Sequence, residues 1–260
     1  MRMNCDESDF GVRKSIFGRS DTGIAARLGT FESRLTNLSS HASTLELERL
    51  VCGTRMFERD HFAVTAHGDL ENIFVLEQGW ACKLMYLTDG RRHISEFFGP
   101  GAICNWSRLS DFEEQDDILF KSGASVCMLD ASSLGELLEK RQELAAIIKQ
   151  HETERTKRTA QRVRAVISLP ATEKLLFLLL DLDNEAMAAG RDPIWMELPF
   201  SQIEIGDILG LTPVHVSRTF TKLEEDGVIA RDGRHIRFAD VDELRKSLSY
   251  RQFFIPAPQN

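Results

Sequence analysis

The segment 201–218 constrains the fold of this chain more than any other. Ser201 and Glu204 have the spacing of a capping box, in which each side chain bonds the backbone N–H of the other residue at the start of a helix. Gly210 predicts the left-handed backbone of a tight turn. Thr212 predicts the N-cap of a second helix. Two short helices joined by a sharp turn are therefore expected.

Three further positions indicate which helix pair this is. Gly206 is small, Gly210 follows four residues later, and Val216 follows six residues after that. In a helix-turn-helix the small residue lets the helices approach, the glycine makes the turn, and the branched residue packs between them. Pro213 fits the first position of the second helix, where its missing N–H costs nothing. A helix corner without a partner is the alternative, but caps, turn and inward positions are all in register for a helix that enters the major groove.

The outward face of this second helix is expected to be cationic. Segment 212–223 contains Arg218 and Lys222 and no acidic residue. Among the side chains there, only that of Arg218 has the rigid fork that suits guanine O6 and N7. The expected base contacts are Arg218, Ser217, His215 and Val214, the last against a thymine methyl group.

A hairpin is predicted after the second helix. The runs Val228–Ala230 and His235–Phe238 flank the turn Arg231-Asp-Gly-Arg234, and segment 228–239 holds three Arg against one Asp. We call this hairpin the wing. Its arginines are expected at phosphates, which position a protein without reading sequence. The expected contacts to the DNA backbone are Thr212, Thr219, Lys222, Arg231 and Arg234.

Between Gly53 and Leu129 short apolar runs alternate with turn signals. Asp89-Gly90 is the strongest hairpin signal, since a tight hairpin turn needs residues that tolerate positive φ. Strands at this spacing are typical of a small antiparallel barrel or sandwich. The predicted strands are His61–Thr65, Asn72–Leu76, Ala81–Leu87, His93–Phe98, Asp117–Phe120 and Ser125–Leu129.

Composition bounds the remaining possibilities. The net charge is −8, which argues against a nucleic-acid partner, but DNA meets the face presented to it and not the whole chain. The longest apolar run, Leu175–Leu180, is too short for a membrane helix. Asp6, Glu7 and Asp9 stand where a signal peptide would be positive. We therefore expect a soluble, cytoplasmic protein with no membrane partner.

With these elements in order, the chain resembles the CRP/FNR family of bacterial transcription regulators. The resemblance rests on the strand-rich segment, a long helix, and the stretch LGLTPVHVSRTFTKLEEDGVI at 209–229 followed by the wing. It implies an α+β fold: an N-terminal antiparallel β-roll (cupin-like, jelly-roll) sensor domain, a long dimerisation helix, and a C-terminal winged helix-turn-helix domain. It also implies a homodimer that binds double-stranded DNA at a palindromic operator, with RNA polymerase as a further partner.

The expected domain boundaries follow from this resemblance. They are an N-terminal extension over 1–44, partly disordered and leading into a short helix near Thr44–Leu50; a β-roll over 45–131; a helical connector over 132–168, with the long helix at Arg141–Ser168; a DNA-binding domain over 169–250, with a helix at Thr172–Ala189; and a tail over 251–260.

The sensor domain departs from family members with known signals. Relatives that read cyclic nucleotides carry a Gly-Glu-Leu stretch and an Arg-Ser pair, whereas this chain has Gly101–Leu109 and an acidic loop at Asp111–Asp117. Relatives with an iron–sulfur cluster carry three N-terminal cysteines besides a later one. Here the N-terminal segment offers only Cys5 besides the later Cys127, and an iron–sulfur cluster normally needs four thiolates.

No cofactor or metal is therefore predicted, and the signal is unidentified. The alternatives left open are a cyclic nucleotide, a redox response, and haem held by Cys82, His93 or Cys104. An enzyme is not expected, since no catalytic motif is found. The rival class is a signalling protein whose helix-turn-helix mediates protein contacts, and DNA binding that weakens steeply with salt distinguishes the two.

The expected dimer seam on the long helix contains both apolar and polar residues. Spacings of three and four residues from Leu144 predict an apolar start and a polar middle. Either the seam lies elsewhere and these charges are solvated, or the polar middle weakens self-association. The predicted seam is Leu144, Ile147 or Ile148, His151, Arg155, Arg158, Arg162 and Ala165.

Overall fold

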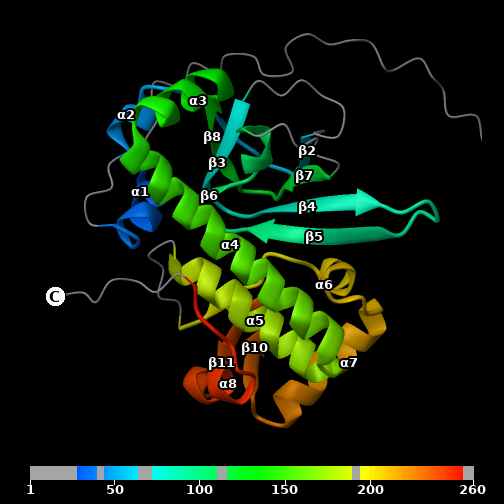
Figure 1. The fold of residues 1–260 in the computed structure, drawn as a ribbon. Helices are drawn as coiled ribbons and strands as arrows, with labels where there is room; N and C mark the ends of the chain where they lie inside the picture. The colour runs from blue at the N-terminus through cyan, green and yellow to red at the C-terminus, as the bar shows by residue number, and fades with distance from the viewer. Residues whose placement is uncertain (1–27, 40–43, 64–71, 110–115, 189–193, 254–260) are drawn as a thin grey trace, which may run out of the picture.

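The computed structural model describes residues 28–39, 44–63, 72–109, 116–188 and 194–253. Its N-terminal part consists of two four-stranded antiparallel sheets, with strand orders β1-β8-β3-β6 and β2-β7-β4-β5 (Figure 1). The strands are β1 (Val51–Met56), β2 (His61–Ala63), β3 (Asn72–Gln78), β4 (Ala81–Tyr86), β5 (Arg92–Phe98), β6 (Ala102–Ile103), β7 (Asp117–Phe120) and β8 (Ser125–Asp130).

Aromatic side chains fill the core of this β-roll. Phe74, Phe98 and Phe120 are at most 1% exposed. The ring of Phe120 stacks on that of Phe57 at a centroid distance of 4.9 Å and meets the edge of Phe74 at 5.6 Å. Such pairs stabilise a core beyond their buried area. The antiparallel β-fold expected from the spacing of apolar runs is confirmed.

The local turn signals were reliable guides to the strands. The hairpin at Asp89-Gly90 forms, with Gly90 at φ +82° and the Leu87 N–H donating to the Arg91 carbonyl at 2.8 Å. Strands β1 and β6 were not predicted, because β1 contains a glycine and lacks a clear alternation, and β6 has two residues. The last two residues of the predicted strand His61–Thr65 lie outside the described residues.

The short helix expected near Thr44–Leu50 forms, and the extension expected over 1–44 contains a further helix that was not predicted. Helix α1 (Gly29–Thr36) buries Phe31 and Leu35 against the β-roll, and α2 (Leu45–Glu48) follows. The carboxylate of Glu77 on β3 accepts the N–H of Thr30 at 2.9 Å. This partner is 47 residues away, so the sequence around α1 gives no sign of it. Residues 1–27 lie outside the described residues.

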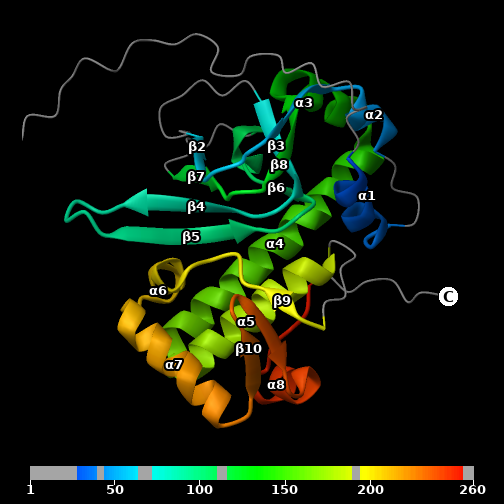
Figure 2. The ribbon, with the colours of Figure 1, turned by 180° about the vertical axis from the view of Figure 1, so that it is seen from behind.

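Three helices follow the β-roll: α3 (Ala131–Lys140), α4 (Gln142–Ser168) and α5 (Ala171–Ala188). Helix α4 begins one residue later than predicted, because Arg141 is not helical. It ends at the extended residue Leu169, which precedes a proline as expected. Helix α4 runs past the β-roll, and its later part packs beside α5 below the β-roll (Figures 1 and 2).

The face of α4 predicted as a dimer seam is instead buried inside the chain. His151 and Arg158 are fully buried, and Arg162 is 4% exposed. The charges in the polar middle of α4 are therefore neither solvated nor exposed to a second subunit. Both interpretations of these charges, as a solvated surface or as part of a weak dimer seam, are wrong. A buried arginine requires a carboxylate or carbonyl nearby, and the reason for the burial is that α5 and β5 supply them.

These buried charges form one cluster, which we call the arginine cluster: Arg34, Arg158, Arg162, Asp181 and Glu185. Glu185 accepts hydrogen bonds from Arg34 at 2.7 Å and from Arg158. Arg162 pairs with Asp181 at 3.2 Å, and the Arg158 guanidinium also donates to the Phe97 carbonyl on β5. Burial raises the pKa of Glu185, but Arg158 and Arg34 outweigh it and lower that pKa to about 2. The cluster joins α1, β5, α4 and α5.

We predict that Glu185→Gln lowers the free energy of unfolding by about 3–5 kcal/mol, because it removes the buried charge that Arg34 and Arg158 share. Urea titration followed by circular dichroism measures this. The stabilisation by Glu185 is present above the ordinary pKa of about 4.3 and is lost as the pH falls through about 2.

The control is Lys140→Ala, which removes an exposed ion pair with Glu136 and is expected to change stability little. An unfolding midpoint of Glu185→Gln equal to that of the wild type would show that the cluster does not hold the fold together.

Candidate nucleic-acid interface

The first helix of the C-terminal motif begins at the predicted capping box. Helix α6 (Gln202–Leu209) starts after Ser201, whose hydroxyl accepts the Glu204 N–H at 3.3 Å. The Glu204 carboxylate in turn accepts the Ser201 N–H at 2.8 Å. Both orphan N–H groups of the helix start are satisfied locally, so the position of α6 follows from its own sequence.

The turn between the helices depends on two glycines. Gly210 has φ +66°, which few other residues adopt without strain. The Leu211 N–H donates to the Gly206 carbonyl at 3.0 Å. A Cβ on Gly206 would lie 2.5 Å from the Leu211 carbonyl oxygen, closer than such atoms can approach. The small residue inferred from the sequence is therefore required by the turn itself.

The second helix, α7 (Pro213–Glu225), is capped as expected. The Thr212 hydroxyl accepts the His215 N–H at 3.2 Å. Val216, Phe220 and Leu223 are at most 1% exposed and pack into the core of the domain. The spacing of these residues had predicted this inward face, and the helix-turn-helix geometry follows from it.

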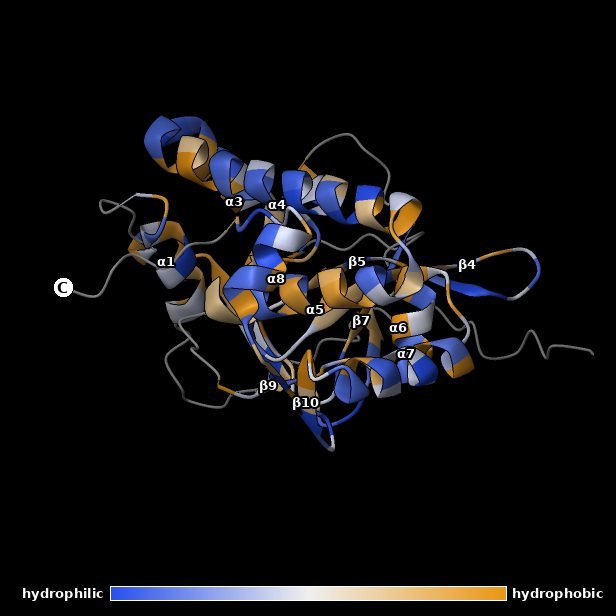
Figure 3. Cartoon of the chain, turned by 90° about the horizontal axis from the view of Figure 1, so that it is seen from below, coloured by the Kyte–Doolittle hydropathy of each residue, from blue (hydrophilic) through white to orange (hydrophobic). Residues whose placement is uncertain are grey.

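The opposite face of α7 is open to solvent. Val214 is 60% exposed, and His215, Ser217 and Arg218 are exposed beside it. Within the described parts of the chain, no hydrogen bond or ion pair engages the Arg218 guanidinium. Figure 3 shows hydrophilic turns along α7 on the underside of the molecule. All four residues expected to read bases are thus accessible on one helix.

The residues expected at the DNA backbone are placed less uniformly. Thr212 and Lys222 lie on the exposed side of α7, where Lys222 has only a surface pair with Asp226. Thr219 is 4% exposed, and its hydroxyl donates to the His215 carbonyl at 2.8 Å. The expectation that Thr219 meets a phosphate is wrong for this structure, because a buried hydroxyl cannot reach one.

The wing also uses its arginines within the protein. It consists of β10 (Ile229–Asp232) and β11 (His235–Phe238), joined to β9 (Met196–Glu197) in a three-stranded sheet. Arg231 pairs with Glu224 at 3.1 Å and lies over the Phe220 ring. Arg234 donates to the Leu198 carbonyl at 2.7 Å. Both arginines therefore already have partners within the fold, and their contacts to phosphate stay predictions.

Comparison with known proteins agrees with this geometry. A model of the Crp-like helix-turn-helix domain matches residues 173–247. The chain is 25% identical over 199 residues to the transcriptional activator protein anr of Pseudomonas aeruginosa, which covers 76% of this chain and 81% of that protein. It is 28% identical over 178 residues to the nitrogen fixation regulation protein FixK of Bradyrhizobium diazoefficiens, covering 68% and 71%.

Residues 173–247 match a Crp-like helix-turn-helix domain, and the curated relatives and solved structures together indicate a regulator of the CRP/FNR family. The fold of the chain matches that of FixK2 from Bradyrhizobium japonicum with a TM-score of 0.67 at 23% identity, over 76% of this chain and 97% of that one. It matches a CooA mutant from Carboxydothermus hydrogenoformans with a TM-score of 0.59 at 14% identity, over 80% and 96%. The expected α+β architecture with a C-terminal helix-turn-helix is confirmed.

Three of the four described thiols, those of Cys82, Cys104 and Cys127, are buried, and Cys52 is exposed. Burial raises the pKa of Cys82 and of Cys127 to about 12, and it raises that of Cys104 as well. A thiolate is needed for metal binding or oxidation, so these three are poorly suited to either. Cys5 lies outside the described residues. Within the described ranges, no three His, Cys, Asp or Glu side chains are grouped to hold a metal ion.

The segment compared with cyclic-nucleotide relatives has a structural role. Gly101–Leu109 contains β6 and a 3-10 helix (Trp106–Leu109), and between them Asn105 is 2% exposed. Its side chain accepts the Phe74 N–H at 2.8 Å and donates to the Asn72 carbonyl at 2.9 Å. Most of the acidic loop, 110–115, lies outside the described residues. Among the described helices, none is long and apolar enough to cross a membrane.

We predict that Gly206→Ala disrupts the helix-turn-helix, because the added methyl group collides with the Leu211 carbonyl. The variant should unfold at a lower temperature, as measured by differential scanning calorimetry, and its DNA retention should fall. The matched control is Gly135→Ala in α3, where a Cβ meets nothing within 4 Å. That substitution should stabilise by about 0.5–1 kcal/mol. Equal melting temperatures for the two variants would contradict the prediction.

Proposed function

We propose that this regulator binds a specific DNA sequence as a homodimer, with one α7 helix in the major groove of each half of a palindromic site. The observation that carries the proposal is the exposed Arg218 on a capped helix whose other face is fully packed. A helix-turn-helix dimer places its two recognition helices about one helical turn of DNA apart. This arrangement makes the operator mirror the symmetry of the protein.

The roles of the recognition residues follow from their chemistry. Arg218 would bind guanine O6 and N7 with two parallel N–H groups, and Ser217 and His215 would add hydrogen bonds beside it. Val214 would meet a thymine methyl group. Thr212 and Lys222 remain as proposed phosphate contacts, since both lie on the open side of α7.

The dimer surface that we propose is the exposed stripe of α4. It follows the alternating three- and four-residue spacing of a coiled coil, and only one of its members is charged. Small side chains in its middle would allow two helices to approach, and Val163 and Ile167 are 49% and 77% exposed near its end. The stripe consists of Gln142, Ala146, Lys149, Thr153, Thr156, Ala160, Val163 and Ile167.

RNA polymerase and a cytoplasmic location complete the proposal, as expected of a bacterial transcription regulator. The signal at the β-roll remains unidentified. The second candidate, a helix-turn-helix that mediates protein contacts, predicts no DNA retention. Gel retardation over a range of salt concentrations separates the two, because neutralised phosphates make DNA affinity fall steeply with salt.

We predict that Arg218→Ala weakens binding to the specific site by about 1–3 kcal/mol and leaves binding to random DNA almost unchanged. The specific site is obtained by selection of fragments from random DNA, and binding is measured by fluorescence anisotropy. Lys222→Ala is the control, which should weaken both kinds of binding alike. Equal losses on both DNAs for Arg218→Ala would show that this residue contacts only phosphate.

We predict that Ala160→Glu converts the dimer into a monomer, because two glutamates would face each other across the closest part of the seam. Sedimentation velocity over a concentration series measures this. Lys140→Glu, which adds the same charge change on α3, is the control and should leave the dimer intact. Sedimentation of Ala160→Glu identical to that of the wild type would place the dimer surface elsewhere.

A further inference from the structure

The β-roll and the DNA-binding domain share one hydrophobic core. Leu84 and Phe97 of the β4–β5 hairpin belong to the same buried cluster as Leu175 of α5 and Ile205 of α6. The Phe97 and Phe200 rings meet edge to face at a centroid distance of 5.7 Å. The two domains are therefore packed against each other and not merely tethered by the residues after α4.

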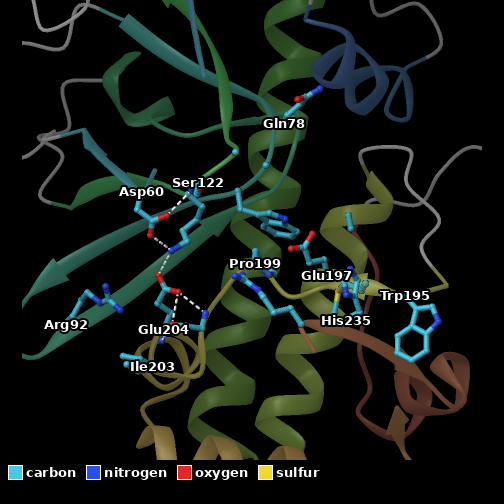
Figure 4. A pocket seen from close by; sticks show the side chains of 18 residues that line it. Asp60, Gln78, Arg92, Ser122, Trp195, Glu197, Pro199, Ile203, Glu204 and His235 are labelled. Atoms are coloured by element: carbon cyan, nitrogen blue, oxygen red, sulfur yellow. Dashed lines mark hydrogen bonds and ion pairs between the residues drawn. The ribbon is translucent and has the colours of Figure 1, made fainter. Parts of the chain in front are cut away.

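Two ion-pair bridges run from the β-roll to α6. The Lys121 ammonium lies 2.7 Å from the Glu204 carboxylate and also pairs with Asp60 (Figure 4). The Arg92 guanidinium donates twice to one oxygen of Asp207, at 2.6 and 2.8 Å. The side chains of all these residues except Asp60 are less than a quarter exposed. Partly buried pairs are screened less by salt than surface pairs, so these bridges hold α6 at two points.

Three of the charged side chains that line the cleft beside the bridges are already paired. The cleft has a volume of about 1000 Å³ and lies between the β-roll and the wing. Lys121, Glu204 and Arg92 line it, and each is already paired across the domain boundary. Burial raises the pKa of Glu204, but hydrogen bonds from Lys121 and Ser201 outweigh it and lower that pKa. Lys121, Glu204 and Arg92 therefore serve the contact between the domains.

The bridged helix determines where the recognition helix lies. Glu204 starts α6 through the capping box, and Asp207 lies one turn further along it. Helix α6 is joined to α7 by the tight turn at Gly210, so α7 cannot move independently of α6. The β-roll is in turn packed on α4, which carries the proposed dimer stripe.

We infer that Arg92 and Lys121 of the β-roll are positioning residues for DNA recognition, which set the separation of the two α7 helices in the dimer. They contact no DNA in this arrangement and act through α6. The inference rests on the proposed function, since only a dimer on a two-part site has such a separation. It gives the β-roll a direct part in choosing which half-site spacing is bound.

The test compares DNA duplexes that differ only in spacing. Wild-type protein is used to select an operator. Its affinity is then measured by fluorescence anisotropy on that operator, on versions with the half-sites moved by one and two base pairs in either direction, and on a single half-site. We expect the wild type to prefer the selected spacing. The ratio of the affinities for the selected and the shifted spacings should fall about tenfold in Arg92→Gln, in Lys121→Gln and in the double variant. A change of this size is typical of the coupling energy between residues in contact.

Two controls separate positioning from a general structural effect. Affinity for the single half-site should be unchanged in every variant, because α7 itself is intact. The exchanged pair Arg92→Asp with Asp207→Arg should restore the spacing preference. Asp207→Asn removes the same bridge from the α6 side and should behave like Arg92→Gln.

The outcomes are distinguishable from failure of the proposed function. Wild-type protein that selects no operator would overturn both the function and the inference. Wild-type protein that binds an operator but tolerates every spacing would overturn the inference alone. Variants that keep the wild-type spacing preference, or that lose half-site affinity in the same proportion, would overturn it as well.

Discussion

The arginine cluster is the constraint on which the rest of the structure depends. A guanidinium cannot be deprotonated in a protein, and its burial is costly unless carboxylates and carbonyls surround it. Arg158 and Arg162 therefore fix the face of α4 that meets α5, since Asp181 and Glu185 lie there. Because Arg158 also bonds the Phe97 carbonyl of β5, the same residues fix how the β-roll and the DNA-binding domain meet.

Because these arginines of α4 are buried, they determine which residues of the helix remain exposed for contact with a second subunit. With Arg158 and Arg162 committed to α5 and β5, the exposed stripe proposed above as the dimer surface keeps Lys149 as its one charged member. Such a face carries little desolvation penalty when a second helix covers it. The helix thereby separates two tasks, with intramolecular packing on the face that carries Arg158 and Arg162 and the proposed self-association on the exposed stripe.

The sequence predicted those features whose partners lie within a few residues. The capping box at Ser201, the turn at Gly210 and the hairpin at Gly90 were found because the groups involved are three to four residues apart or depend on a single backbone angle. Helix α1 and the orientation of α4 were missed because their partners are distant. Arg34 meets Glu185 across 151 residues, and Arg158 meets Phe97 across 61. Periodicity identifies a polar face but not what covers it.

The same limit explains why some of the arginines expected to contact DNA are paired within the fold and another is not. Arg231 and Arg234 each have a partner in the fold: Glu224 and the Leu198 carbonyl. Arg218 has none among the described residues, and an exposed, unpaired cation adds nothing to the stability of the chain. The Arg218 side chain is exposed on a rigid, well-capped helix, so it loses conformational entropy only when it binds a partner. Arg218 takes no part in these internal contacts, so its guanidinium is available to bind a partner. The edge of a guanine is the partner that its geometry fits.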